Sequence, residues 1–316
     1  MNIERIYLAA PRGFCAGVAY AIEVVDLALK VHGPPLYVRH AIVHNEHVVR
    51  SFEKQGVIFV EDVEEIPIGS VVVFSAHGVS PVVREAAKAR NLNVIDATCP
   101  LVTKVHREVV RYANQGYSML YIGHRGHVEA EGTMGEAPAN MTLVDGVAEA
   151  ESVMAPEGKL AVVTQTTLSV DEVEQIMDVL RRRFPHLEKP AKEDICYATT
   201  NRQIAVKALS EQCDVVLVVG SRSSSNSNRL REVAESHGVP SHLVMEPSDL
   251  QNELFENKSR VGITSGASTP ESLVEAIIGK LLSQCPNAKV ETLETIHEDV
   301  TFIPPRDLIA LAQAKG

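Results

Sequence analysis

Short apolar runs alternate along this chain with longer stretches in which apolar residues recur at helical spacing. The apolar runs cover residues 6–10, 70–74, 118–122, 160–163, 215–219 and 260–263. The stretches with helical spacing cover residues 18–31, 81–89, 101–112, 170–184, 200–211, 228–237 and 270–282. Nearly continuous apolar strands that alternate with helices are typical of parallel sheets covered by helices. The pattern therefore predicts an α/β fold with mostly parallel sheets.

Five of the predicted strands are followed by segments that are rich in small and polar residues. These segments cover residues 75–78, 123–129, 164–167, 220–226 and 264–268. In sheets of this kind, ligands bind outside the carboxyl ends of the strands. We therefore expect a polar cavity lined by loops from several sheets.

Three of the five cysteines occupy equivalent places in this pattern. Cys15, Cys99 and Cys196 each directly precede a predicted helix, at similar intervals along the chain. We interpret the chain as three small related α/β units around a pseudo-threefold axis. The predicted units cover residues 14–98, 99–193 and 194–282, with an N-terminal strand in 1–13 packing on the core, a linker at 188–194 and a C-terminal tail at 283–316 that is not a domain.

Composition and charge narrow the class of protein. The 316 residues are 45% hydrophobic and 22% charged, which is typical of a globular protein with packed cores. The net charge of −11 disfavours general nucleic-acid binding. The sequence shows no signal-peptide pattern and no apolar run of membrane-spanning length. We therefore expect a cytoplasmic protein with reduced thiols and no membrane or nucleic-acid partner.

The placement of the three cysteines suggests a metal site. A thiolate directly before a helix is stabilised by unpaired backbone N–H groups and by the helix dipole. Three converging thiolates suit a 4Fe–4S cluster in which one iron has no protein ligand. A single cysteine of this kind would more often be a small buried residue. We interpret Cys213 and Cys285, which do not fit the pattern, as structural thiols.

Histidines and one glutamate in the polar loops are candidates for binding and proton transfer. His44, His77 and His127, with His124 as a weaker candidate, could bind phosphate oxygens as protonated imidazoles. Glu129, two residues after His127, is a candidate proton donor if burial raises its pKa. Taken singly, each of these residues would more often be an ordinary surface or capping residue.

Hydroxyl-rich loops before two predicted helices form a third group of candidates. Ser224, Ser225 and Asn226 precede one helix, and Ser268 precedes another. Helix N-termini with such residues can bind phosphate groups, although each loop alone is more often only an N-cap. The sequence has no P-loop and no dinucleotide-binding glycine motif, which argues against a nucleoside triphosphatase or a Rossmann dehydrogenase.

Many of these segments together resemble one known family, the 4-hydroxy-3-methylbut-2-enyl diphosphate reductases. The matching segments are 11–17 (PRGFCAG), 39–45 (RHAIVHN), 74–80 (FSAHGVS), 96–102 (DATCPLV), 123–133 (GHRGHVEAEGT), 164–169 (TQTTLS), 196–203 (CYATTNRQ), 219–228 (VGSRSSSNSN) and 266–268 (GAS). They occur in the family's order and span residues 6 to about 270, with a looser match in the tail. Chance resemblance over so many segments is very improbable.

The resemblance implies a trefoil of three α/β units around a central iron–sulfur site. By this resemblance, Cys15, Cys99 and Cys196 hold the cluster, and Glu129 supplies protons with the help of Thr166. His127 is expected to be a catalytic residue beside them. The residues that would hold the substrate diphosphate are His44, His77, His127, Thr166, Ser224, Ser225, Asn226 and Ser268. The cluster is expected to be 4Fe–4S, with a 3Fe–4S form or complete loss as outcomes of isolation in air.

The resemblance also implies the reaction. The substrate hydroxyl would bind the open iron, and two electrons from a ferredoxin or flavodoxin would expel it as water. Protonation at either end of the remaining allyl group would give isopentenyl or dimethylallyl diphosphate. Two alternatives are an iron–sulfur redox sensor, which would leave Glu129 and the phosphate loops without a role, and a Cys/His zinc hydrolase. The hydrolase is disfavoured because the sequence lacks clustered ligands such as H-E-x-x-H.

Overall fold

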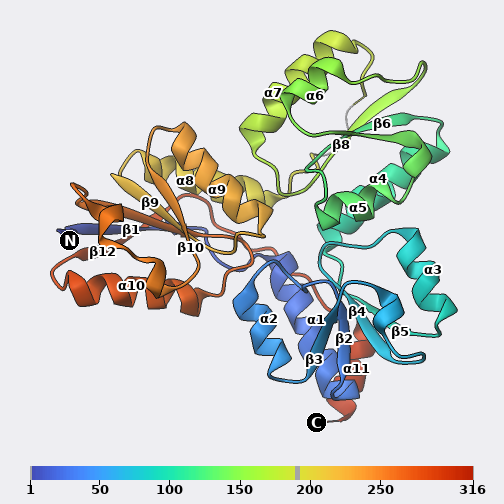
Figure 1. The fold of residues 1–316 in the computed structure, drawn as a ribbon, viewed down its shortest axis with the longest axis horizontal. Coiled ribbons are helices and arrows are strands. Elements are labelled where there is room, and N and C mark those ends of the chain that lie inside the picture. Colours follow the sequence, from blue (N-terminus) through green and yellow to red (C-terminus); the bar gives the residue numbers. More distant parts are fainter. Residues whose placement is uncertain (1, 189–192, 316) are drawn as a thin grey trace. The chain divides into compact units, whose positions relative to one another are not determined.

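The chain forms an α/β fold with three parallel sheets, as the sequence predicted (Figure 1). The structure, a computed structural model, describes residues 2–188 and 193–315, so residues 189–192 of the predicted linker lie outside the described residues. The chain divides into two compact units. The first comprises Met1–Cys15, His44–Glu46 and Tyr197–Val300, and the second comprises Ala16–Val43, His47–Cys196 and Thr301–Gly316.

The first unit is built on a five-stranded parallel sheet. Its order is β10 (Ser241–Val244), β9 (Val215–Val219), β11 (Arg260–Ser265), β1 (Arg5–Ala10) and β12 (Lys289–Glu294). Helices α8 (Tyr197–Ser210) and α9 (Ser225–Ser236) cover one face, and α10 (Glu271–Gln284) covers the other (Figure 1). Every residue of β9 is buried because helices cover both faces, which explains its unbroken apolar sequence. The 3₁₀ turns η3 (Pro247–Asp249) and η4 (Asn252–Phe255) follow β10.

The second unit contains two smaller parallel sheets. The first has the order β3 (Val57–Val60), β2 (Leu36–Arg39), β4 (Val71–Phe74) and β5 (Asn93–Asp96). The elements around it are α1 (Ala16–His32), α2 (Glu46–Glu53), η1 (Val63–Glu65), α3 (Pro81–Ala89) and α11 (Arg306–Ala314). Leu308 and Ala312 of α11 pack in the same hydrophobic cluster as Ala21 and Val25 of α1. The C-terminal helix is therefore part of this core.

The other sheet of the second unit has three strands. Its order is β7 (Met141–Val144), β6 (Ser118–Ile122) and β8 (Leu160–Thr164). The elements around it are α4 (Pro100–Asn114), α5 (Val128–Met134), η2 (Pro138–Asn140), α6 (Val147–Ser152) and α7 (Val170–Arg183). Helix α4 begins at Pro100, whose missing N–H and restricted φ suit the first position of a helix.

The two ends of the chain join elements that are distant in the sequence. Strand β1 pairs with β11 and β12, so the N-terminal strand joins the sheet formed by the third predicted unit and the tail. The tail contributes β12 to that sheet and α11 to the second unit, and α11 was not predicted. The division at residues 14–98, 99–193 and 194–282 stays a prediction, as does the arrangement of these parts around a shared axis.

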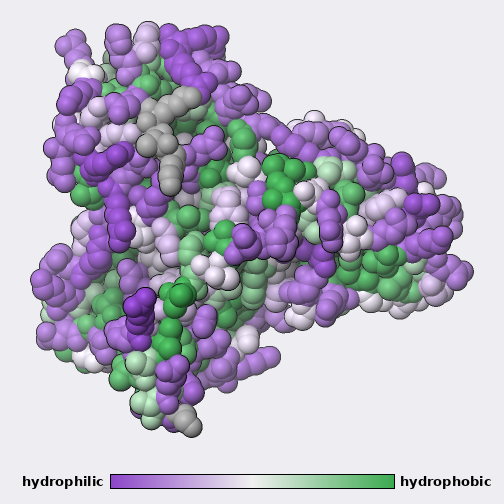
Figure 2. Space-filling model, turned by 180° about the vertical axis from the view of Figure 1, so that it is seen from behind, coloured by the Kyte–Doolittle hydropathy of each residue, from purple (hydrophilic) through white to green (hydrophobic). Residues whose placement is uncertain are grey.

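The exposed residues are mostly hydrophilic. On the face shown in Figure 2, hydrophobic residues are scattered among hydrophilic ones. Large apolar side chains that are exposed include Ile68, Met154 and Ile303. Among the described residues, no helix has both the length and the apolar character needed to cross a membrane.

Candidate active site

The three predicted cysteine ligands have equivalent backbone environments. Cys15 directly precedes α1, Cys99 is the N-cap of α4, and Cys196 directly precedes α8. In each case the cysteine N–H donates to a carbonyl oxygen in a loop that follows a strand. The acceptors are Ala267 for Cys15 (3.1 Å), Ala76 for Cys99 (3.0 Å) and Thr166 for Cys196 (3.0 Å). Each cysteine is thus joined to a loop that carries or adjoins a predicted substrate residue.

The side chains of these cysteines differ from those of the other two. Cys15, Cys99 and Cys196 are partly buried, and none of the five cysteines, all of which are described, forms a disulfide. Cys213 and Cys285 are buried in hydrophobic clusters, and burial raises the pKa of Cys213 to about 12. Thiols at helix N-termini suit thiolate ligands, whereas a buried thiol with such a pKa stays protonated. The first three therefore fit a soft metal centre, and Cys213 fits a structural role.

The turn that carries Cys15 is held by residues distant in sequence. The Gly13 N–H donates to Ser265 Oγ (2.8 Å), and the Gly13 carbonyl accepts from Arg202 Nη2 (2.8 Å). Arg202 is fully buried and pairs with Glu298 at 3.1 Å. Arg202 lies in the family-like segment 196–203 but was not predicted as a site residue, and no local pattern marked Glu298, because both act through tertiary contacts. Arg202 connects the Cys15 turn with α8.

Replacing Glu298 by alanine is expected to lower the free energy of unfolding by about 3 kcal/mol, because it leaves a buried guanidinium without its counter-charge. The matched control is Glu235→Ala, which removes an exposed pair with Arg231 (3.0 Å) and should cost less than about 0.5 kcal/mol. Denaturant titration of both variants measures the difference. Equal costs would show that the Arg202–Glu298 pair does not stabilise the turn.

Glu129 has the properties of a buried acid. It lies in the first turn of α5 and is 3% exposed. Its two carboxylate oxygens accept from the Thr166 N–H (2.7 Å) and the Thr166 hydroxyl (3.0 Å). Burial raises the pKa of Glu129 to about 7, although the two hydrogen bonds from Thr166 act in the opposite direction. At neutral pH, a substantial fraction of Glu129 therefore carries a transferable proton.

His127 and His77 lie close to this acid within the second unit. His127 is the N-cap of α5, and its Nδ1 accepts from the Glu129 N–H (3.2 Å), so a neutral ring carries its proton on Nε2. The His77 and His127 ring centroids are 6.3 Å apart. Burial, together with His124 and His40, lowers the pKa of His127 to about 4. His127 is thus neutral at pH 7, which corrects the prediction of a protonated ring.

The remaining predicted substrate residues gather in the first unit. Ser224 caps α9 and accepts from the Ser227 N–H (3.2 Å), and Ser225 begins this helix. The Asn226 side-chain oxygen accepts from the Ala267 N–H (2.9 Å). Ser268, which follows Ala267 in the chain, donates to the His44 carbonyl (3.0 Å). Ser224, Asn226 and Ser268 are all buried, and their contacts join the two loops before α9 and α10 to the segment that carries His44.

The predicted site residues therefore form two groups, one in each unit. Glu129, Thr166, His127 and His77 adjoin one another in the second unit, whereas Ser224, Asn226, Ser268 and His44 are linked in the first. His124, the weaker candidate, is held by Asp145 through its Nδ1 (3.1 Å). Gln165 was not predicted as a site residue, and it orders the Thr166 loop by accepting from the His124 N–H (3.0 Å).

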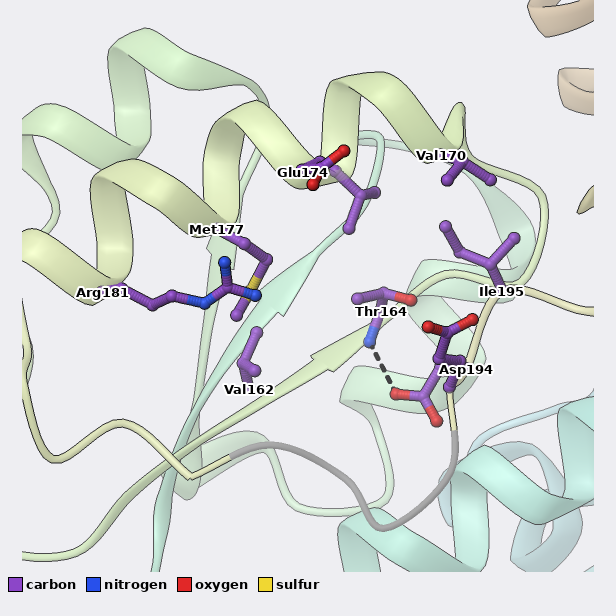
Figure 3. A pocket seen from close by; sticks show the side chains of 10 residues that line it. Val162, Thr164, Val170, Glu174, Met177, Arg181, Asp194 and Ile195 are labelled. Atoms are coloured by element: carbon purple, nitrogen blue, oxygen red, sulfur yellow. Dashed lines mark hydrogen bonds between the residues drawn. The ribbon is translucent and has the colours of Figure 1, made fainter.

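A separate cavity of about 270 Å³ lies beside α7 and β8 in the second unit (Figure 3). Met177, Val162 and Ile195 form apolar walls, and Asp194 accepts from the Thr164 N–H (3.0 Å). The ten described residues that line it include none of the predicted site residues. We therefore do not place the active site there.

Comparison with known proteins identifies the family. The model of the LytB protein family matches residues 6–282. The 4-hydroxy-3-methylbut-2-enyl diphosphate reductase of Mycolicibacterium paratuberculosis is 53% identical over 96% of this chain and 92% of its own length. The corresponding reductase of Neisseria meningitidis serogroup C is 52% identical over 98% and 96%.

A solved structure gives the same result. The E-1-hydroxy-2-methyl-but-2-enyl-4-diphosphate reductase of Plasmodium falciparum has a TM-score of 0.95 at 41% identity, and the match covers 99% of each chain. Iron–sulfur chemistry is characteristic of the LytB family. The matches cover nearly the whole chain, including every predicted site residue. The chain therefore belongs to the LytB family, the 4-hydroxy-3-methylbut-2-enyl diphosphate reductases.

Proposed function

We propose that this protein reduces 4-hydroxy-3-methylbut-2-enyl diphosphate to isopentenyl and dimethylallyl diphosphate. The reaction consumes two electrons and two protons and releases the substrate hydroxyl as water. The observation that carries the proposal is a series of hydrogen bonds through Thr166. This residue donates twice to the buried acid Glu129 and accepts from the N–H of Cys196 (3.0 Å), a predicted metal ligand. A proton donor is thereby joined to the predicted metal site through one residue.

Cys15, Cys99 and Cys196 would hold an iron–sulfur cluster, most simply of the 4Fe–4S type. The three thiols support this proposal because each is partly buried and directly precedes a helix. When bound, the cluster supplies single electrons and a Lewis-acidic iron. The electrons would come from a small reduced protein, a ferredoxin or a flavodoxin, in the cytoplasm.

Glu129 would donate protons through the Thr166 hydroxyl. When Glu129 is protonated on Oε2, the hydroxyl 3.0 Å away can accept that proton and donate its own toward the substrate. One proton leaves with the hydroxyl as water, and the other is added to the allyl carbon chain. A carboxyl group with a pKa of about 7 suits this task because it is both available as an acid and easily reprotonated at neutral pH.

The other predicted residues would bind the diphosphate. Ser224, Ser225 and Asn226 lie at the N-terminus of α9, where backbone N–H groups and the helix dipole favour an anion. Neutral His127 would donate a hydrogen bond to the diphosphate through Nε2–H. His77, whose ring is close to that of His127, would also bind the diphosphate. Binding energy from the diphosphate would position the distant alcohol for reaction.

The test is anaerobic purification followed by an absorbance spectrum, an iron count and an assay with the diphosphate substrate and a chemical reductant. We expect a brown protein that contains iron and consumes the substrate, with isopentenyl and dimethylallyl diphosphate as products. A colourless protein containing zinc would contradict the proposal. A brown protein that leaves the substrate unchanged would instead favour a redox sensor.

A further inference from the structure

The turn at residues 77–80, called here the 77–80 turn, packs tightly against α4. Gly78 has a φ of +78°, which a residue with a side chain rarely adopts. A Cβ atom at this position would lie 3.0 Å from His106 Nε2 and 3.3 Å from the Thr98 methyl carbon. The turn that presents His77 is therefore supported from one side by the His106 ring.

The 77–80 turn also packs closely against α5 and the residue that follows it. A Cβ atom at Gly132 of α5 would lie 3.2 Å from the Gly78 carbonyl oxygen. A Cβ atom at Gly135, directly after α5, would lie 2.4 Å from Ser80 Cβ. Because α5 begins with His127 and Glu129, this close packing brings the proposed acid and two proposed ligand-binding histidines together.

A polar network, in which the His106 and Glu136 side chains are buried and Arg84 is exposed, holds the two sides of this contact. His106 Nδ1 lies 2.8 Å from Glu136 Oε1, and Arg84 Nη2 donates to the same oxygen at 2.6 Å. Arg84 Nη1 also donates to the Val79 carbonyl within the 77–80 turn (2.8 Å). Glu136 lies two residues beyond α5. The network therefore connects α4, the end of α5 and the 77–80 turn.

One edge of the His106 ring donates a hydrogen bond to Glu136, and the opposite edge packs against Gly78. The ring is 7% exposed, and burial lowers its pKa, which favours the neutral form. A neutral ring can donate from Nδ1 to Glu136, which leaves a lone pair on Nε2. Nε2 has no hydrogen-bond partner within the part of the chain that the structure describes. That edge faces Gly78, so His106 both anchors Glu136 and fills the space beneath the 77–80 turn.

We propose that His106 and Glu136 are positioning residues for the reaction: they fix the 77–80 turn against α5 and so set the 6.3 Å separation of the His77 and His127 rings. This inference rests on the proposed function, because it assumes that both histidines bind the substrate diphosphate. Neither His106 nor Glu136 is placed in contact with the substrate.

Two substitutions at His106 separate its two roles. His106→Asn keeps a donor for Glu136 but removes the ring edge beneath Gly78. His106→Phe keeps a ring there but removes the donor. We expect both variants of the iron-loaded protein to show kcat/KM at least about 10-fold below the wild type, with an increase in KM, because misplacing a binding group by about 1 Å is costly. We also expect the Kd for inorganic diphosphate, measured by calorimetry, to rise several-fold.

Val179→Ala is the control, because Val179 is a buried residue of α7 whose hydrophobic cluster contains no residue of α5 or of the 77–80 turn. It should lower Tm without changing kcat, KM or the Kd for inorganic diphosphate. If the His106 variants behave in the same way, His106 is only structural and the inference is wrong. If the wild-type protein itself does not reduce the substrate, the proposed function fails. The comparison of Kd values would still test whether the network positions a diphosphate-binding group.

A smaller substitution tests the same contact in case the His106 variants do not fold. Gly132→Ala adds one methyl group where only 3.2 Å separates it from the Gly78 carbonyl. Gly279→Ala in α10 is its control, since no atom outside its own stretch of helix lies within 4 Å of the new methyl. We expect Gly132→Ala to lower kcat/KM several-fold and Gly279→Ala to leave it unchanged. Unchanged kinetics in folded Gly132→Ala would overturn the inference.

Discussion

Replacing Glu129 by glutamine is expected to lower kcat by about 10²–10⁴-fold, the usual contribution of a general acid. Glutamine has nearly the same shape, and its carbonyl oxygen can still accept a hydrogen bond from the Thr166 N–H (2.7 Å in the wild type). It has no acidic proton to deliver through the Thr166 hydroxyl. The iron content and the absorbance spectrum should stay as in the wild type, because Glu129 is not a proposed metal ligand. Steady-state kinetics and an iron assay on the same preparation measure both effects.

Glu131→Gln provides the control for that experiment. Glu131 lies on the same helix but is exposed, and its side chain should not take part in proton transfer. We expect this variant to keep full activity. Full activity in Glu129→Gln would exclude the proposed acid, and loss of iron would show that Glu129 supports the metal site instead.

The pH dependence follows from the raised pKa of Glu129. The acid must be protonated to act, so kcat should fall by about 10-fold per pH unit above its pKa of about 7. Stability should follow the same direction. Since the unfolded carboxyl ionises near 4.5 and the folded one near 7, the contribution of Glu129 to stability falls as pH rises through this window, by roughly 3 kcal/mol in total, whereas the lowered pKa of His127 acts in the opposite direction. Glu129→Gln should lose the Glu129 contribution to both pH effects, which is measured as the difference between wild type and variant in rate profiles and in denaturant titration at pH 5 and pH 8.

Replacing Cys99 by serine is expected to abolish stable cluster binding and reduce activity to background. The serine hydroxyl is a harder and far less acidic ligand than a thiolate, so it suits iron–sulfur coordination poorly. The same outcome is expected for Cys15→Ser and Cys196→Ser, because all three cysteines occupy equivalent backbone positions. Iron content and the visible absorbance of anaerobically purified protein measure the effect.

Cys213→Ser is the matched control. Cys213 is buried among apolar side chains and keeps its proton, so the variant should retain iron and lose about 1–3 kcal/mol of stability from burying a hydroxyl. Loss of iron in Cys213→Ser, with retention in any one of the other three variants, would show that the ligand set is wrong.

Elements with strong local signals could be predicted from the sequence. Helix α3 was predicted with its observed bounds, because Pro81 marks its start and apolar residues recur at helical spacing after it. Strand β9 was likewise predicted in full, because five apolar residues in succession are expected in a strand covered on both faces. Both signals arise within a single element.

Short or half-exposed elements were missed. Strand β5 has four residues, none of them buried, so it lacks an apolar run. Helix α5 has only seven residues, which is too short to show a helical period, and Glu129 was therefore expected in a loop. The tail helix α11 was also missed, although it has nine residues like α3; it follows two prolines in a tail that was not expected to form a domain. Its apolar positions are explained by packing against α1.

By itself, the sequence determined the fold class and the family, because both depend on residue type and order along the chain. It also identified the residues of the candidate site, whose roles stay predictions. Only the tertiary structure decided the protonation states of those residues and the contacts that hold them in place. Burial sets the pKa of Glu129 at about 7 and that of His127 at about 4, and no sequence pattern shows how deeply either side chain is buried. The pairing of β1 with β11, and the contacts of Arg202 and His106, likewise join residues far apart in the chain. Such contacts depend on the packing of distant segments, which leaves no local signal in the sequence.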